Sequence, residues 1–138
     1  LQRPLRSGII NVSSTLSLIP SPYMANYSGT KGFTNQLSKG ISLILGCSLI
    51  NLDKIDILCV QPFVVETKLS GQSNRCDIIS PEECAKSSLD KLGIETETQG
   101  HWKHRLIYWF ISQLPESIVN YVVKSSFSDL NARKNQPV

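Results

Sequence analysis

Short apolar runs alternate with amphipathic segments along this chain, a pattern typical of α/β proteins. Residues 7–13 and 54–61 are short runs rich in isoleucine and valine, and each predicts a buried strand of a parallel sheet. Between them a helix is expected to begin near Ala25, because apolar side chains then recur every three or four residues: Phe33, Leu37, Ile41 and Leu45. These elements predict an α/β fold with at least two parallel strands.

A second helix has a clear start signal. Ser80, Pro81 and Glu83 form a capping box with proline at the first helical position. The helix is expected to run to about Leu92 and to stop at Gly93, since glycine is the usual residue just beyond a helix end.

The rest of the chain predicts smaller elements. Residues 94–102 leave room for a short third strand, and Pro115 opens another helix expected to end near Lys124. The chain beyond is polar and is expected to fray. We therefore expect one domain over residues 1–125 and a polar tail over residues 126–138.

Composition narrows the classes of protein. With 138 residues, 41% hydrophobic and 18% charged, the chain suits one globular domain with a modest core. The net charge of +3 comes without a dense run of lysine and arginine, so no nucleic-acid partner is expected. The apolar runs are all shorter than the ~18 residues that a membrane span needs. The four cysteines show no C-x-x-C pair, which predicts reduced thiols and no zinc site: Cys47, Cys59, Cys76 and Cys84.

Two histidines and several aromatic residues near the end of the chain invite further hypotheses. His101 and His104 lie three residues apart without a nearby third ligand, so structural roles are favoured over a metal site. The aromatic side chains here line either an acyl or sterol channel or an ordinary apolar stripe, and the sequence leaves both alternatives open: Trp102, Tyr108, Trp109 and Phe110.

The candidate chemistry lies at the start of the first helix. Tyr27 and Lys31 are four residues apart, which places them on one helix face, and a cation beside a phenol favours the phenolate. Ser14 follows the first apolar run, 13 positions before Tyr27, and Pro62 and Thr67 follow the second run. Taken singly, these residues have ordinary explanations: a strand-end hydroxyl, a helix N-cap or a solvated charge.

In this order and spacing the residues resemble the short-chain dehydrogenase/reductase family. The resemblance implies that Ser14 polarises a substrate carbonyl and that Tyr27 is the general acid or base. It also implies that Lys31 holds the nicotinamide ribose and tunes the tyrosine, so that Tyr27 and Lys31 both belong to the cofactor-binding residues.

The segment after the second apolar run extends the resemblance. Pro62, Val65 and Thr67 match the family's Pro-Gly-x-Val-x-Thr segment, whose backbone and threonine meet the nicotinamide carboxamide. Phe63 stands where glycine is usual, a departure shared with the subfamily of 17β-hydroxysteroid dehydrogenase type 12 and very-long-chain 3-oxoacyl-CoA reductase. The similarity to this subfamily covers roughly residues 7–125.

The resemblance implies NADP or NAD as cofactor, with NADPH favoured, and a 3-oxoacyl-CoA or a 17-ketosteroid as substrate. No Gly-x-x-x-Gly-x-Gly loop for the pyrophosphate occurs in the sequence. We therefore interpret the chain as the C-terminal half of a Rossmann-type doubly wound parallel sheet, inactive on its own. The subfamily further implies the endoplasmic reticulum membrane, reached through an upstream anchor. The alternative location is the cytoplasm. The family uses the tyrosine helix for homodimers, so the alternative is a non-catalytic fragment that only packs or dimerises.

Overall fold

The fold is known from a computed structural model, which describes residues 7–46, 55–67 and 78–134, with side chains up to residue 125. Cys47 and Cys76 lie outside the described residues. The described elements follow one another in this order: β1 (Ser7–Val12), a 3₁₀ helix η1 (Thr15–Ser17), α1 (Ala25–Leu45), β2 (Ile55–Val60), α2 (Pro81–Leu89), β3 (Glu97–Thr98), α3 (Trp102–Ser112) and α4 (Glu116–Lys134).

The three strands form one parallel sheet in the order β1-β2-β3. Strands β1 and β2 pair along their whole length, from Ser7 opposite Ile55 to Val12 opposite Val60. The short strand β3 pairs with the end of β2, where Val60 lies opposite Thr98. The α/β prediction and the third strand are thus confirmed. Its place in a larger Rossmann-type sheet stays a prediction.

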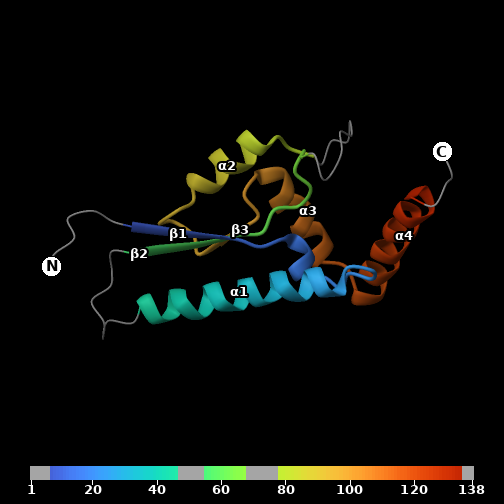
Figure 1. The fold of residues 1–138 in the computed structure, drawn as a ribbon, viewed down its shortest axis with the longest axis horizontal. Coiled ribbons are helices and arrows are strands. Elements are labelled where there is room, and N and C mark those ends of the chain that lie inside the picture. Colours follow the sequence, from blue (N-terminus) through green and yellow to red (C-terminus); the bar gives the residue numbers. More distant parts are fainter. Residues whose placement is uncertain (1–6, 47–54, 68–77, 135–138) are drawn as a thin grey trace.

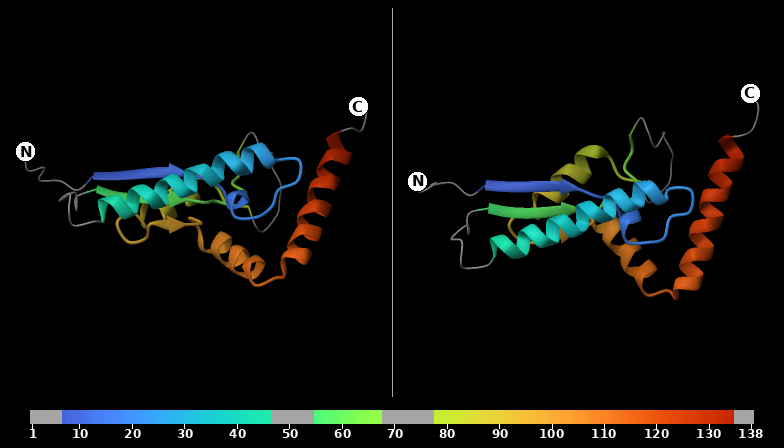
Figure 2. Two further views of the ribbon diagram at one scale, coloured as in Figure 1. Left: turned by 90° about the horizontal axis from the view of Figure 1, so that it is seen from below. Right: turned by 60° about the horizontal axis from the view of Figure 1, so that its bottom comes forward.

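Helices cover both faces of this sheet. Helix α1 runs along one face and α2 lies on the other, while α3 lies beyond the carboxyl ends of the strands (Figure 1 and Figure 2). The central strand β2 is buried on both sides, which explains its nearly unbroken apolar run: Ile57, Leu58, Cys59 and Val60. The outer strand β1 is more open, and Ile9, Ile10 and Val12 are exposed among the described residues.

Helix α1 begins at Ala25 as predicted, whereas α2 is shorter than expected. It ends at Leu89 rather than near Leu92, because the next amides bond three residues back, from Leu92 to the Leu89 carbonyl for example. This tighter turn leads to Gly93, whose φ of +80° is a conformation that glycine adopts without strain. The chain then continues to β3.

The C-terminal helix is longer than expected. Helix α4 continues through Lys134, past the predicted end at Lys124, so the fraying expected there is wrong for residues 125–134. The physical reason is that polar composition does not end a helix, and no glycine or proline occurs between Glu116 and Lys134. Figure 2 shows α4 standing away from the sheet. Within the described part of the chain, no helix combines the length and the apolar character required to span a bilayer.

Candidate active site

Ser14 lies at the carboxyl end of β1, where the strand gives way to η1. Its side chain is 8% exposed, and its hydroxyl oxygen accepts a hydrogen bond of 3.2 Å from the backbone amide of Leu16 as the helix N-cap. This bond occupies one acceptor position of the hydroxyl and leaves its proton to be donated elsewhere. Ser14 can therefore still donate to a substrate oxygen.

The ends of β1 and β2 are joined by hydrogen bonds next to Ser14. The amide of Ser13 donates to the Val60 carbonyl over 2.7 Å, and the amide of Thr15 donates to the Pro62 carbonyl over 3.0 Å. The Thr15 hydroxyl also donates to the Gln61 carbonyl over 2.8 Å. These bonds place the residues that follow β1, Ser13 to Thr15 (the Ser14 loop), beside the segment 62–67. Both lie at the carboxyl ends of the strands, where α/β proteins bind ligands.

Tyr27 and Lys31 lie together at the start of α1, as their spacing predicted. The Lys31 Nζ is 5.8 Å from the centroid of the Tyr27 ring, and it donates a hydrogen bond of 2.9 Å to the Val12 carbonyl. The Ser13 hydroxyl donates to the Lys31 carbonyl over 2.8 Å. Tyr27 itself is 42% exposed. Helix α1 is thus tied to the end of β1, while convergence of the Ser14 and Tyr27 hydroxyls stays a prediction.

The segment 62–67 leaves the end of β2 toward Thr67, which is exposed. Val65 forms an isolated parallel bridge with Ile79, and the amide of Glu66 donates to the Ile79 carbonyl over 2.9 Å. Phe63 does not need the backbone freedom of the glycine that is usual there, since the only non-glycine residue with positive φ in the described ranges is Tyr23. The structure therefore accommodates phenylalanine without backbone strain.

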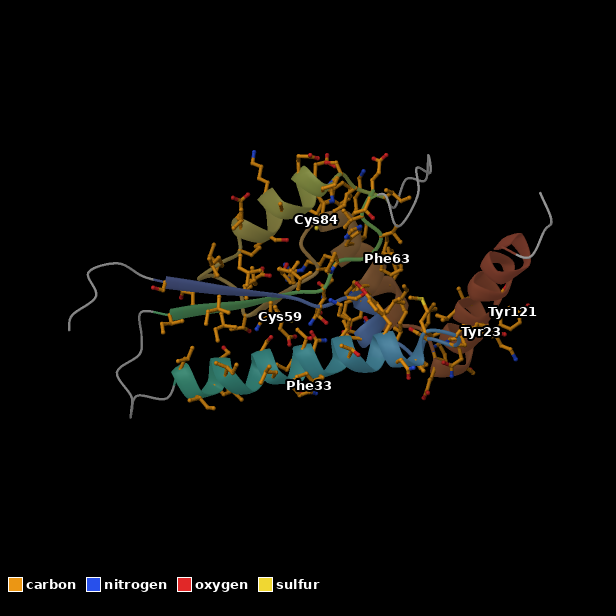
Figure 3. All side chains as sticks on the ribbon, in the orientation of Figure 1. Tyr23, Phe33, Cys59, Phe63, Cys84 and Tyr121 are labelled. Carbon is orange, nitrogen blue, oxygen red and sulfur yellow. The ribbon has the colours of Figure 1, made fainter. Side chains whose placement is uncertain are left out.

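His104 holds this segment from α3. It is fully buried, and its Nδ1 accepts a hydrogen bond of 3.2 Å from the backbone amide of Phe63. The two rings lie 6.2 Å apart between centroids. Figure 3 shows Phe63 beside α3. Sequence reasoning gave His104 only a general structural role. In the described part of the chain, no three histidine, cysteine or acidic side chains gather as metal ligands.

A buried polar cluster that sequence reasoning missed lies beneath these elements. Asn35 on α1 is 4% exposed and bonds to side chains from two other elements: Ser17 in η1, and Cys59 and Gln61 at the end of β2. The only sequence signals were a polar residue four positions after Lys31 and a glutamine that ends an apolar strand.

The two described cysteines are unsuited to nucleophilic catalysis. Burial raises the pKa of the Cys59 thiol, and burial likewise raises the pKa of Cys84, which is half-buried. A raised pKa reduces the fraction of reactive thiolate at neutral pH. The hydroxyl and ammonium groups described above are therefore the better candidates for chemistry.

The residues that the sequence predicted for a nicotinamide nucleotide carry hydrogen-bond donors. An ammonium group and a phenol from α1, with the hydroxyl of Thr67 and the backbone amides before it, are groups that bind ribose hydroxyls and a carboxamide. The sequence offers no glycine-rich loop for the pyrophosphate. Convergence of these groups on a nicotinamide and its ribose therefore stays a prediction.

Comparison with known proteins finds similar sequences. The family "short chain dehydrogenase" matches residues 4–77. Very-long-chain 3-oxoacyl-CoA reductase-B of Danio rerio is 33% identical over 83% of this chain and 36% of its own length, and the Anas platyrhynchos reductase is 28% identical over 91% and 39%. The human "inactive hydroxysteroid dehydrogenase-like protein 1" is 27% identical over 80% and 34%. This chain thus spans little more than a third of the length of these relatives.

A solved structure has a similar fold. A structure described under 7β-hydroxysteroid dehydrogenase stereoselectivity superposes with a TM-score of 0.70 at 18% identity, covering 85% of this chain and 47% of that one. The three-stranded parallel sheet with its helices is therefore an arrangement found in dehydrogenases of this fold.

Proposed function

Because this chain belongs to the short chain dehydrogenase family, we propose that it carries the proton-donating and nicotinamide-binding part of an NAD(P)-dependent ketone reductase. One observation carries the proposal. Lys31 lies beside the Tyr27 ring and is bonded to the end of β1, directly next to the loop that holds Ser14. A phenol, an ammonium group and a serine hydroxyl at one sheet edge are what carbonyl reduction by acid catalysis requires.

The proposed roles follow from the chemistry of each group. The hydroxyl of Ser14 donates a hydrogen bond to the substrate carbonyl oxygen and polarises it. Tyr27 donates a proton to the same oxygen as negative charge develops on it, and Lys31 places a positive charge beside the ring that gives up this proton. The nicotinamide, when bound, supplies the hydride. Pro62, Val65 and Thr67 hold its carboxamide, and Lys31 also binds its ribose.

For the substrate we propose a 3-oxoacyl-CoA, with a 17-ketosteroid as the second choice, and NADPH as the reductant. The names of the relatives support this order, since several are very-long-chain 3-oxoacyl-CoA reductases and one is hydroxysteroid dehydrogenase-like. Large apolar substrates of both kinds suit the exposed apolar side chains of α3: Trp102, Leu106, Trp109 and Phe110.

The test measures oxidation of NADPH by a polypeptide that carries this chain together with a dinucleotide-binding glycine loop. With a 3-oxoacyl-CoA present, the absorbance of NADPH should fall. Tyr27→Phe keeps the ring and removes the proton donor, so it should lower turnover by on the order of 10² or more with little change in cofactor affinity. Tyr23→Phe is the matched control, because Tyr23 is an exposed tyrosine in the loop before α1. Equal turnover by Tyr27→Phe and the parent would refute the proposed mechanism.

The second candidate function is association without catalysis through α1. The side of α1 that faces away from the sheet carries Phe33, which is 68% exposed (Figure 3). By helical spacing the exposed Leu37 and Ile44 lie on the same side. Gly29 and Gly40 on the same side have open space around them. Two glycines thus lie among larger apolar side chains there, which suits close packing against a second helix. Sedimentation analysis of this chain tests it. A dimer that Phe33→Ser dissociates would support it, and a monomer at high concentration would exclude it.

A further inference from the structure

A chain of side-chain hydrogen bonds runs under the candidate site from α3 to the Ser14 loop. Gln99, just before α3, donates to the Oε1 of Gln61 over 3.2 Å, and Gln61 donates to the Oδ1 of Asn35 over 2.9 Å. Asn35 donates to the Ser17 hydroxyl over 2.7 Å, and Ser17 donates to the Ser14 carbonyl over 2.6 Å. In this series of four hydrogen bonds, every donor is directed toward Ser14.

The single proton of the Ser17 hydroxyl fixes the direction of these hydrogen bonds. The Ser17 hydroxyl has a single proton, which goes to the Ser14 carbonyl, so its oxygen must accept from Asn35. Asn35 must therefore present its NH₂ group to Ser17 and its carbonyl oxygen to Gln61. That oxygen also accepts from the Cys59 thiol over 3.0 Å. Aligned hydrogen bonds of this kind polarise one another, and each is stronger in a buried setting.

Asn35 lies where the three candidate elements meet. It follows Lys31 by four residues and Tyr27 by eight, so all three side chains lie on one side of α1. Its partner Ser17 bonds to Ser14 itself, and its partner Gln61 directly precedes Pro62. A single amide thus joins the tyrosine helix, the serine loop and the segment 62–67.

We propose that Asn35 is a positioning residue for the reductase site, setting the Ser14 loop and the segment 62–67 at their distances from Tyr27. This inference rests on the proposed function. Asn35 touches none of the reacting groups itself; it acts through Ser17 and Gln61. A displacement of about 1 Å between reacting groups can lower turnover by on the order of 10²-fold. An error in the place of Ser14 or of the segment 62–67 therefore affects turnover far more than substrate binding.

Ser38 provides the matched control for Asn35. It lies one helical turn further along α1, is 2% exposed, donates to the Thr34 carbonyl over 2.7 Å and accepts from Asn11 over 2.9 Å. These bonds involve neither η1 nor the segment 62–67. Ser38 also contacts the Cys59 thiol, which bonds to Asn35. Ser38→Ala therefore removes buried hydrogen bonds beside the same cysteine but leaves the bonds from Gln61 to Asn35 and from Asn35 to Ser17 in place.

The first arm of the test uses this chain alone and needs no activity. Hydrogen exchange is followed at the Thr15 amide, which donates to Pro62, and at the Ser17 amide, which donates to the Ser14 carbonyl. Asn35→Leu, which keeps the side-chain size, and Asn35→Asp, which has no proton for Ser17 when ionised, should each speed exchange at both amides at least tenfold. Ser38→Ala should leave both within threefold. Unchanged exchange at both amides in Asn35→Leu would overturn the inference, whether or not the chain reduces any ketone.

The second arm applies to the polypeptide in which Tyr27→Phe has been found to abolish turnover, so that failure of the proposed function is recognised separately. Asn35→Leu should lower kcat by on the order of 10²-fold while the KM for the acyl-CoA changes less than threefold. Ser38→Ala should lower the melting temperature by a similar amount with kcat within threefold of the parent. If the two variants lose kcat equally at equal loss of melting temperature, Asn35 has only a structural role.

Discussion

Lys31 donates a hydrogen bond of 2.9 Å to the backbone carbonyl of Val12, while its ammonium group lies 5.8 Å from the centre of the Tyr27 ring. One side chain thus joins the tyrosine helix to the end of β1, two residues before Ser14. The bond also limits the rotamers of a long, flexible side chain, which would otherwise lose considerable entropy on binding a ligand. Lys31 is therefore held in place before any ligand arrives.

Lys31→Met removes the ammonium group and keeps most of the aliphatic chain. Turnover in the NADPH assay of the proposed function should fall by on the order of 10²-fold, because both the positive charge beside Tyr27 and the bond to Val12 are lost. Lys39→Met is the control. Lys39 lies on the same helix and pairs with Glu97 over 3.0 Å, away from Tyr27. Steady-state kinetics of both variants check this, and similar losses in the two would contradict a specific role for Lys31.

His104→Asn should preserve the contact with Phe63, whereas His104→Gln should lose it. The side-chain amide of asparagine places a carbonyl oxygen near the position of Nδ1, but that of glutamine reaches the position of Nε2. Exchange of the Phe63 amide proton, measured by NMR, should therefore be at least tenfold faster in His104→Gln than in His104→Asn. Equally fast exchange in the two variants would show that Nδ1 does not protect this amide.

Cys59 should resist alkylation in the folded protein. It is fully buried, and burial raises the pKa of its thiol, so few molecules carry the thiolate at pH 8. Iodoacetamide labelling followed by peptide mass spectrometry should modify Cys84 sooner, because Cys84 is only half-buried. In urea both should react at the rate of a free thiol. Prompt labelling of Cys59 without denaturant would contradict the packing of α1 against β2.

The start of α2 should become less stable in acid. Hydrogen bonds from the backbone and side chain of Ser80 hold the pKa of the Glu83 carboxyl below its usual value. A lowered pKa in the folded state stabilises the protein above the unfolded pKa, and this contribution disappears as the pH falls through the folded pKa. The denaturation midpoint of Glu83→Gln should therefore depend less on pH below about 5 than that of the parent.

Ser80→Ala tests the other half of the capping box. Loss of the cap bond to the Glu83 amide should cost about 1 kcal/mol of unfolding free energy at neutral pH. Urea denaturation followed by circular dichroism measures it. Ser87→Ala serves as the control, because that hydroxyl bonds only to carbonyls within its own helix among the described contacts. An equal loss in the two variants would mean that the cap contributes nothing special.

The sequence by itself determined the elements whose signals are local. Residues 7–12 and 55–60 form strands as predicted. Only the second is the buried strand that the apolar runs predicted, because Ile9, Ile10 and Val12 of β1 are exposed among the described residues. A serine followed by proline and, three residues on, by glutamate is a local signature of a helix start, so the start of α2 was clear. The four-residue step from Tyr27 to Lys31 likewise placed both on one side of α1 without any knowledge of the fold.

Only the tertiary structure decided which distant polar groups meet. The pairing of Asn35 with Gln61, and of His104 with the Phe63 amide, joins residues more than twenty positions apart. No local pattern predicts such pairs. A buried polar side chain bonds to whichever group the packed backbone brings within reach, and that group can be far away in the sequence. The end of α4 was also missed, since polar residues without glycine or proline permit a helix as readily as a tail. The candidate chemistry was thus visible in the sequence, whereas the contacts that hold it together arise only when the strands, the loops and α1 pack.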